Sequence, residues 1–360
     1  MQKLDWVDAL RGYAILGVIC VHTLMDDQQV FLNKFWSTGH KGVELFFLVS
    51  AFTLLLSYNR RKEEDLNVGN FFIRRYFRIA PMFYFALVYF LIQDRNLPYP
   101  ASYMQNASPS NIIAHSLLLN GVSPHWINSI VPGGWSVGVE VLFYMMCPFL
   151  FLKITNVKKA MLYYFISFIA GQILYFYLLA NPLITDGIKW ELFLYYYLPS
   201  HFFIFMLGFI AYYTTKMTIK EASKYIAVLV VSCVFFYAVL RLMPFANYKL
   251  INNNLMGIFF VLVINVLSRY SVPIIVNPLI RYLGKISFSV YLTHFAAMYV
   301  LNVFKLNELT QNHNQNFLIR LILVLVIAVP ISTITYRLIE IPFQELGKKL
   351  IKKRLAYSKA

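Results

Sequence analysis

Charged residues are scarce in this 360-residue chain. Asp, Glu, Lys and Arg make up 13% of it, whereas 59% is hydrophobic and 18% is aromatic. About a quarter of an average soluble domain is charged, so this composition excludes a soluble globular protein. The sequence also lacks low-complexity stretches and internal repeats of about 20–50 residues. The composition therefore indicates a polytopic membrane protein.

Cysteine is scarce as well. The three cysteines, Cys20, Cys147 and Cys233, all lie within hydrophobic runs. They have neither paired spacing nor the spacing of metal ligands, so we expect buried free thiols and no metal centre.

Hydrophobic runs of about 17–22 residues recur along the whole chain, and polar or basic loops bound each of them. They predict an all-α transmembrane bundle of about ten helices and leave no room for a separate soluble domain. The first run lacks the small-residue cleavage site of a secretory signal, so we expect it to remain as a helix of the mature protein. The predicted spans cover residues 9–25, 42–58, 79–94, 136–152, 160–180, 196–213, 225–243, 250–268, 286–304 and 317–338.

The basic residues follow this topology. The net charge of +16 is not gathered into one patch or arm, so we expect no nucleic-acid partner. Ten crossings put both termini on one side of the membrane, and most of the 32 Lys and Arg lie on that side. Basic loops mark the cytoplasmic side, so both termini are predicted to be cytoplasmic.

Two regions follow from this topology. Residues 1–343 are expected to form the membrane-embedded domain, and residues 344–360 a basic amphipathic cytoplasmic tail. In the tail, Lys and Arg alternate with Leu and Ile, which is typical of a helix that lies on anionic membrane lipids.

The first hydrophobic run carries Arg11 and His22, two side chains that are energetically unfavourable inside a membrane unless they have partners. Eleven residues of α-helix turn about 1100° and rise roughly 16.5 Å, so the two side chains share one face at very different depths. Intramembrane charges of this kind often mark a functional path. The alternative is that Arg11 snorkels to lipid headgroups while His22 bonds a neighbouring helix.

Two further motifs place charge at the membrane boundaries. Glu44 lies one turn inside the second run, either as a functional carboxylate or simply at the interface. Arg75 and Arg78 are three residues apart, so they project from one side of a helical turn. Guanidinium groups so arranged suit phosphate recognition, although they could also be plain flanking charges.

The longest outward segment covers residues 95–135. Its one apolar piece, 111–120, is too short to span, which predicts a re-entrant or half-buried helix. The next run carries Ser136, Glu140 and Tyr144 at intervals of four, which predicts a polar stripe on one helix face. In the middle of the chain, His201 and Asn265 are interpreted as ordinary interhelical hydrogen-bonding residues.

These groups separate by depth, with arginines near the cytoplasm and His22 and the carboxylates in the outer part of the membrane. The arginines could hold the phosphates of an activated donor. The rise between Arg11 and His22 is comparable to an extended pantetheine arm, which favours an acyl-CoA over a sugar nucleotide. His22 could act as general base on an acceptor hydroxyl, with Glu140, Glu44 or Asp26 orienting or supporting the imidazole.

Six blocks of sequence carry a resemblance to a known family. In this order and on this topology they resemble the acyltransferase-3 family of integral membrane acyltransferases, which includes bacterial O-antigen and exopolysaccharide O-acetyltransferases. The blocks are Leu4-Asp5 through Leu10-Arg11-Gly12 with His22, Gly42-Val-Glu-Leu-Phe-Phe, Arg75-x-x-Arg78 with Ile79 and Pro81, Trp135-Ser136 with Glu140 and Phe143-Tyr144, Ile286-Ser287 through Tyr291-Leu292 and His294, and Glu340-x-Pro342.

The resemblance implies a ten- or eleven-helix enzyme of the bacterial cytoplasmic (inner) membrane. Such an enzyme moves an acyl group, usually acetyl, from cytoplasmic acyl-CoA to a hydroxyl of a carbohydrate or lipid-linked glycan. The family's essential Arg and His correspond to Arg11 and His22, and its arginine pair to Arg75 and Arg78. Of the residues expected at the site, we assign catalysis to His22, Glu140 and Glu44, donor binding to Arg11, Arg75 and Arg78, and substrate contact to Ser136, Trp135 and His294.

The chain departs from the family pattern in two places. The usual Ser-Gly-Phe of the second helix is Ser50-Ala51-Phe52, which puts the close backbone approach at that point in doubt. About twenty residues follow the last predicted span, so we expect no esterase-like domain after it.

Two other function classes stay open. A transporter or flippase for glycans or lipid-linked sugars would also need many helices and intramembrane charges, but the halves of the chain show no inverted hydropathy repeat. A scaffold subunit of a polysaccharide assembly complex would need none of the residues above.

Overall fold

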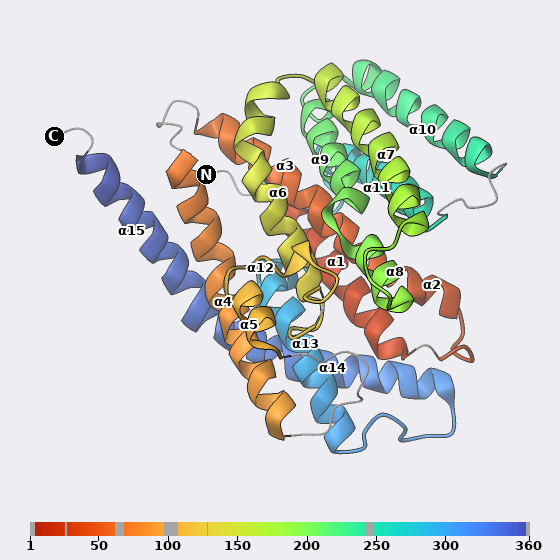
Figure 1. The fold of residues 1–360 in the computed structure, drawn as a ribbon, viewed down its shortest axis with the longest axis vertical. Coiled ribbons are helices and arrows are strands. Elements are labelled where there is room, and N and C mark those ends of the chain that lie inside the picture. The colour runs from red at the N-terminus through yellow and green to blue at the C-terminus, as the bar shows by residue number, and fades with distance from the viewer. Residues whose placement is uncertain are drawn as a thin grey trace.

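The computed structural model describes residues 4–25, 27–61, 68–96, 107–127, 129–241 and 248–357. These residues form an all-helical bundle, and no strand occurs among them (Figure 1). The long helices are α1 (Asp5–Leu24), α3 (Gly42–Arg60), α4 (Val68–Asn96), α6 (Gly134–Lys153), α7 (Val157–Ala180), α9 (Phe202–Thr214), α10 (Ile219–Arg241), α11 (Tyr248–Leu267), α13 (Ser287–Val303) and α14 (His313–Thr335).

Shorter helical elements lie between these. The α-helices are α2 (Asn33–Ser37), α5 (Pro109–Ser116), α8 (Gly187–Tyr196), α12 (Pro278–Lys285) and α15 (Ile341–Tyr357). The 3₁₀ turns are η1 (Thr38–Lys41), η2 (Asn120–Val122) and η3 (Leu198–Ser200), and the π-helix is η4 (Tyr336–Glu340).

The predicted spans correspond to helices one by one. Among the described residues, seven helices are long and apolar enough to cross a membrane, and the bent pair α12–α13 makes eight. Two shorter apolar helices, Phe202–Thr214 and Ile251–Leu267, occupy the other two predicted spans. The prediction of an all-α bundle of about ten membrane helices is therefore confirmed. The short helices α2, α8 and α12 were not predicted, because hydropathy does not mark such brief turns.

Helix α1 lies in the middle of the bundle and contacts α3, α12, α13 and α14. Its contact with α12 depends on glycine. A Cβ atom on Gly284 would lie 1.7 Å from the carbonyl oxygen of Asp8, and one on Gly12 would lie 2.2 Å from that of Ile280. Both distances are far below van der Waals contact, so the two backbones touch where the helices cross.

A second close crossing joins α3 to α9. A Cβ atom on Gly208 of α9 would lie 2.4 Å from the carbonyl oxygen of Leu48 and 2.7 Å from the Cβ atom of Ala51. Ala51 is fully buried. The sequence put a close backbone approach at Ala51 in doubt, because the family pattern has glycine there. The two helices still approach closely, because the glycine at this crossing is Gly208 of the facing helix α9.

A short helix, α5, is also present where a re-entrant or half-buried helix is predicted. Helix α5 spans eight residues, which is too short to cross a bilayer, and η2 follows it and packs against α6. Asn111 and His115 of α5 are fully buried, and the Nδ2 atom of Asn111 donates to Ser129 Oγ at 2.9 Å. Two buried polar residues explain why α5 lies against protein rather than lipid.

The ninth predicted span, 286–304, corresponds to α13. The short helix α12 precedes it and meets it at an angle of 81° around Ile286. This bend was not predicted, because hydropathy does not register the direction of a helix.

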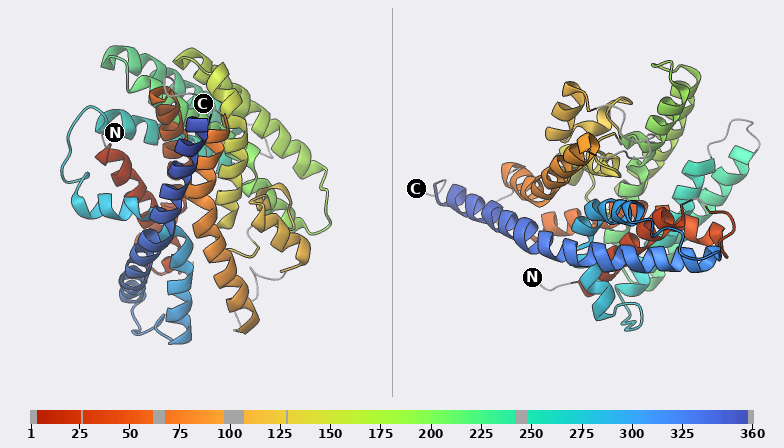
Figure 2. Two further views of the ribbon diagram at one scale, coloured as in Figure 1. Left: turned by 90° about the vertical axis from the view of Figure 1, so that its left-hand side faces the viewer. Right: turned by 90° about the horizontal axis from the view of Figure 1, so that it is seen from below.

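The last span continues into the predicted tail. Helix α14, the π-helix and α15 run as one long rod along one side of the bundle (Figure 2). Pro342 explains the π-helix, since its ring would clash with the carbonyl of Leu338 in a regular α-helix and a wider turn relieves the clash. Helix α15 packs on α4, where a Cβ atom on Gly347 would lie 3.0 Å from the Cβ atom of Phe77. Its position on anionic lipid stays a prediction.

The glycine contacts make a testable prediction. Gly284→Ala is expected to destabilise the fold by about 1–3 kcal/mol, because the added methyl group overlaps the Asp8 carbonyl and pushes α12 away from α1. Gly187→Ala is the matched control, since a Cβ atom there would stand in open space. Thermal unfolding of the detergent-purified protein, followed by tryptophan fluorescence, measures the difference. Equal melting temperatures for the two variants would contradict the prediction.

Candidate active site

A small cavity lies between α1, α3, α4, α6 and α13, with a volume of about 80 Å³. Four of the predicted site residues line it: Arg11, Arg78, Ser136 and Glu140. They come from three different helices, so the fold brings together what the sequence keeps apart. We call this space the central cavity. Its other walls are Val43, Phe46, Phe47, Ser50, Ile79, Val137, Tyr144, Ser287, Phe288 and Tyr291.

Glu140 is held by two hydroxyl groups. Ser50 Oγ donates to Glu140 Oε1, and the Tyr144 hydroxyl donates to the same oxygen at 2.5 Å. The Ser50 Oγ atom also lies 3.3 Å from the Tyr144 hydroxyl oxygen. A carboxylate in an apolar interior needs such partners. The predicted stripe of Ser136, Glu140 and Tyr144 therefore faces the cavity as a whole.

Ser136 belongs to a second hydrogen-bonded group at the start of α6. Its Oγ atom lies 2.8 Å from the Tyr291 hydroxyl, and both side chains donate to the carbonyl oxygen of Gly133 at 3.0 Å. Gly133 has a φ of +75°, and a Cβ atom there would lie 2.9 Å from the Tyr291 hydroxyl. Only glycine fits this position.

The arginines of the central cavity face the Glu140 carboxylate from two helices. Arg11 Nη2 donates to Thr53 Oγ1 of α3 at 3.3 Å, and Arg78 lines the same wall from α4. Thr53 and Ser50 were not predicted. In the sequence they are marked only by two hydroxyl residues one turn apart in a very apolar helix. This pattern is common in membrane helices and does not by itself indicate a site.

Arg75 does not share the central cavity with Arg78. It lines a separate space of about 230 Å³ between the ends of α3, α4 and α6, which we call the outer cavity. Its Cζ atom lies 5.8 Å from the ring centroid of Phe71 and 5.9 Å from that of Tyr144. Its Nε atom is buried, with no hydrogen-bond partner among the described residues.

His22 contacts two rings of α13. The His22 ring centroid lies 5.4 Å from that of His294 and 4.6 Å from that of Phe295. His294 is fully buried, and its Nδ1 atom lies 2.8 Å from the Tyr291 carbonyl oxygen. The proton must then be on Nδ1, which leaves Nε2 as an acceptor without a partner among the described residues.

These contacts form a line of polar residues from the central cavity to His22. Ser136 Oγ meets the Tyr291 hydroxyl, the Tyr291 backbone carbonyl oxygen meets His294 Nδ1, and the His294 ring lies beside the His22 ring. Helix α1 carries one end of the line at Arg11 and the other at His22. Among the described residues, no three His, Cys, Asp or Glu side chains come together as metal ligands.

Glu44 lies apart from this line. It is buried, and its Oε1 atom is 3.8 Å from Lys41 Nζ, which also bonds Asn253 of α11. Glu44 and Glu140 thus have partners other than His22, and their predicted support of the imidazole stays a prediction. Asp26, the third carboxylate considered, lies outside the described residues.

Trp135 is expected to contact the substrate, but it does not line the central cavity. Its ring stacks on Tyr196 at 4.3 Å and lies 5.3 Å from His201. His201 Nε2 bonds the Tyr195 carbonyl oxygen, and Asn265 Nδ2 donates to Thr214 Oγ1 of α9 at 2.9 Å. His201 and Asn265 thus form the ordinary interelement hydrogen bonds predicted for them.

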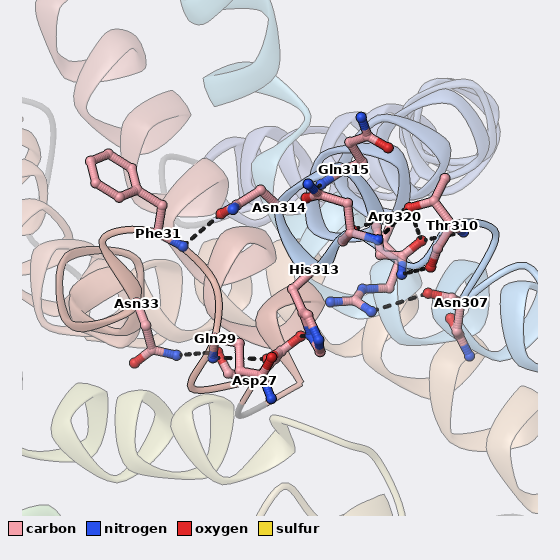
Figure 3. A network of polar contacts seen from close by, with 12 residues as sticks. Asp27, Gln29, Phe31, Asn33, Asn307, Thr310, His313, Asn314, Gln315 and Arg320 are labelled. Carbon is pink, nitrogen blue, oxygen red and sulfur yellow. Dashed lines mark hydrogen bonds and ion pairs between the residues drawn. The ribbon is translucent and has the colours of Figure 1, made fainter.

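The end of α1 beyond His22 is held by a polar network (Figure 3). His313 Nδ1 lies 2.7 Å from Asp27 Oδ2, and this bond lowers the pKa of Asp27. The Phe31 amide donates to Asn314 Oδ1 at 2.6 Å. Arg320 joins this corner from α14 and was not predicted, although a charge inside an apolar run is the signal that could have found it.

Comparison with known proteins identifies the family of the chain. Residues 4–337 match the acyltransferase domain family. The chain is 24% identical to "Putative O-acetyltransferase SAR0937" of Staphylococcus aureus (strain MRSA252) over 99% of its own length and 60% of that protein. It is 27% identical to "Peptidoglycan O-acetyltransferase OatA" of Listeria monocytogenes over 43% of its length and 26% of that protein.

The chain thus spans about 60% of the length of its staphylococcal relative. No solved structure matches it significantly. The family match covers nearly the whole chain, including five of the six blocks, and the sixth, Glu340-x-Pro342, lies just beyond it. The chain therefore belongs to the acyltransferase-3 family.

Proposed function

We propose that this protein is a membrane-bound O-acyltransferase of the bacterial cytoplasmic membrane. It moves an acyl group, acetyl in the simplest case, from cytoplasmic acyl-CoA to a hydroxyl of a cell-surface carbohydrate or its lipid-linked precursor. The family supports acyl transfer, and the relatives are named as O-acetyltransferases, one of them of peptidoglycan. The observation that carries the proposal is the polar line from the arginine-lined central cavity to His22.

The arginines fit an anionic donor. Arg11 and Arg78 face the central cavity, and Arg75 faces the outer cavity with its Nε atom buried and without a hydrogen-bond partner in the part of the chain that the structure describes. A buried donor without a partner is costly, so an acceptor such as a phosphate oxygen would stabilise this state. Coenzyme A carries its phosphates at one end of a long flexible arm. The thioester at the other end can then reach deep into the bundle.

His22 is proposed as the general base. The rise from Arg11 to His22 is roughly 16.5 Å along α1, which is comparable to an extended pantetheine arm. In a direct transfer, His22 takes the proton of the acceptor hydroxyl while its oxygen bonds to the thioester carbonyl carbon. The carbon–sulfur bond breaks, and the proton passes from His22 to the leaving thiolate. Contact with His294 and Phe295 holds the His22 ring in place.

Glu140 is proposed to set the charge of the central cavity. It is the one carboxylate among the described residues lining this cavity, and it faces two arginines. Its bonds to Ser50 and Tyr144 keep it there. Ser136 and Tyr291 also line this cavity, and their hydroxyl groups can contact the substrate there.

The assignment of His22 predicts a specific loss. His22→Ala should abolish O-acylation of cell-surface glycans while the protein still inserts into the membrane, because no base remains to take the hydroxyl proton. His125→Ala is the matched control, since His125 is exposed on the segment between η2 and α6. Mass spectrometry of glycans from cells expressing each variant measures the acyl groups. Retained acylation in the His22 variant would remove His22 from the mechanism.

The donor assignment predicts binding of coenzyme A. Purified protein should bind it, and Arg75→Ala with Arg78→Ala should weaken binding by at least tenfold, since each charged hydrogen bond contributes about 1.5–3 kcal/mol. Lys158→Ala with Lys159→Ala removes the same charge from the exposed start of α7 and should leave the affinity unchanged. Titration calorimetry in detergent measures both. A protein that binds no coenzyme A would contradict acyl transfer and favour the transport alternative.

A further inference from the structure

The two arginines of the Arg75-x-x-Arg78 motif face different cavities. Residues three apart on a helix point about 60° away from each other, which is enough to separate them where a neighbouring helix intervenes. Here α6 intervenes through Tyr144, whose ring contacts Arg75 and whose hydroxyl bonds Glu140 on the central side. Arg78 belongs to the central cavity and Arg75 to the outer one.

Three arginines line the outer cavity. Arg61 at the end of α3 and Arg74 on α4 line it together with Arg75. The described residues that line it include no carboxylate. In the central cavity, by contrast, Glu140 offsets part of the charge of two arginines. The outer cavity therefore suits a group with several negative charges, and the central cavity suits a group with less negative charge.

The outer cavity also has aromatic walls. The Tyr58 ring stacks on the Phe151 ring at 4.5 Å, and Phe71 lies beside the Arg75 guanidinium. Aromatic faces and guanidinium planes bind flat bases by stacking. The volume of about 230 Å³ lies below the roughly 300–1,000 Å³ of pockets that enclose a whole small ligand. The cavity thus fits one end of a long ligand.

We propose that the outer cavity binds the phosphorylated adenosine end of the acyl-CoA donor, through Arg61, Arg74 and Arg75, while Arg11 and Arg78 face the pantetheine arm on its way to the thioester at His22. This inference rests on the proposed function and divides its donor site in two. The Tyr144 side chain lies between the parts, where the pantetheine arm has to pass.

Adenosine 3′,5′-bisphosphate is the probe for this site, because it carries phosphates and base without arm or thioester. Purified wild-type protein should bind it. Arg61→Ala with Arg74→Ala should weaken binding of both the bisphosphate and coenzyme A by tenfold or more. Arg78→Ala should leave the bisphosphate affinity within twofold of wild type. Titration calorimetry measures the affinities, and melting temperatures show that each variant is folded.

The outcomes separate this inference from the proposed function. If acetyl-CoA binds but the Arg61 and Arg74 variant keeps full affinity for the bisphosphate, or the bisphosphate does not bind, the inference is wrong and the proposed function stands. If added phosphatidylglycerol does not displace the bound bisphosphate, the outer cavity is a nucleotide site. If the bisphosphate fails to bind, and the Arg61 and Arg74 variant loses phosphatidylglycerol that co-purifies with the wild-type protein, the outer cavity is a lipid headgroup site. A protein that binds no acetyl-CoA overturns both.

A second inference comes from the opposite end of α1. Arg320 of α14 is only 5% exposed. Its Nε atom donates to the Thr23 carbonyl oxygen at 2.9 Å, and its Nη1 atom donates to the Asn307 carbonyl oxygen at 3.1 Å (Figure 3). Thr23 directly follows His22. Asn307 lies in the loop after α13, the helix that carries His294.

Arg320 therefore ties together the two helices whose histidines touch. The last carbonyl groups of a helix have no partner within it, and a cation there also suits the helix dipole. The Asp27–His313 pair and the bond from Phe31 to Asn314 fix the following loop to the start of α14. We infer that Arg320 is a positioning residue that holds His22 against His294.

Arg320→Gln should lower glycan O-acylation per folded protein at least tenfold and leave coenzyme A affinity within twofold of wild type. Arg320→Lys keeps a cation that reaches one carbonyl and should restore part of the activity. Arg337→Gln, at an exposed position of the same rod, is the control. Unchanged acylation in Arg320→Gln, or parallel losses of acylation, donor affinity and melting temperature in both Arg320 variants, would overturn the inference.

Discussion

Direct contact between helix backbones around α1 is the constraint on which the other interactions of the site depend. Serine and threonine hydroxyls are short, so they can bond a charged group on another helix only where two helices lie very close. Ser50 reaches Glu140 and Thr53 reaches Arg11 in this way. Gly42 at the start of α3 allows this approach to α1, since a Cβ atom there would lie 2.2 Å from the carbonyl oxygen of Ala14. Close helix packing and the charged residues of the site therefore depend on each other, since the charged groups find their hydroxyl partners only where helices lie close.

Much of the fold follows from the sequence, and the reason is physical. Apolar runs long enough to span a bilayer have to become helices, because the backbone finds no other partners in lipid. Every predicted span has its helix. The bend at Ile286 and the π-helix before Pro342 were not predicted, since both are local changes of backbone geometry that hydropathy does not register.

The site is predictable only in part. Spacing along α6 correctly places Ser136 with Glu140 on one helix face, and Arg11 and His22 lie on one unbroken helix, as a shared face of α1 requires. It says nothing about which neighbouring helix meets each face. Arg75 therefore separates from Arg78, Glu44 pairs with Lys41, and Trp135 packs against Tyr196. Contacts between helices are set by glycine crossings and ring packing that a single sequence does not reveal.

The π-helix at Tyr336–Glu340 has a consequence for helix phase. Ser332 bonds Thr293, and Glu340 accepts from Ser289, so both sides face α13. Eight residues of regular α-helix turn about 800°, which would leave the two side chains about 80° apart. The one additional residue of the π turn removes about 100° of this rotation and returns Glu340 to within about 20° of Ser332. The wider turn thus acts as a phase correction that keeps a carboxylate facing protein where a regular helix would rotate it toward lipid.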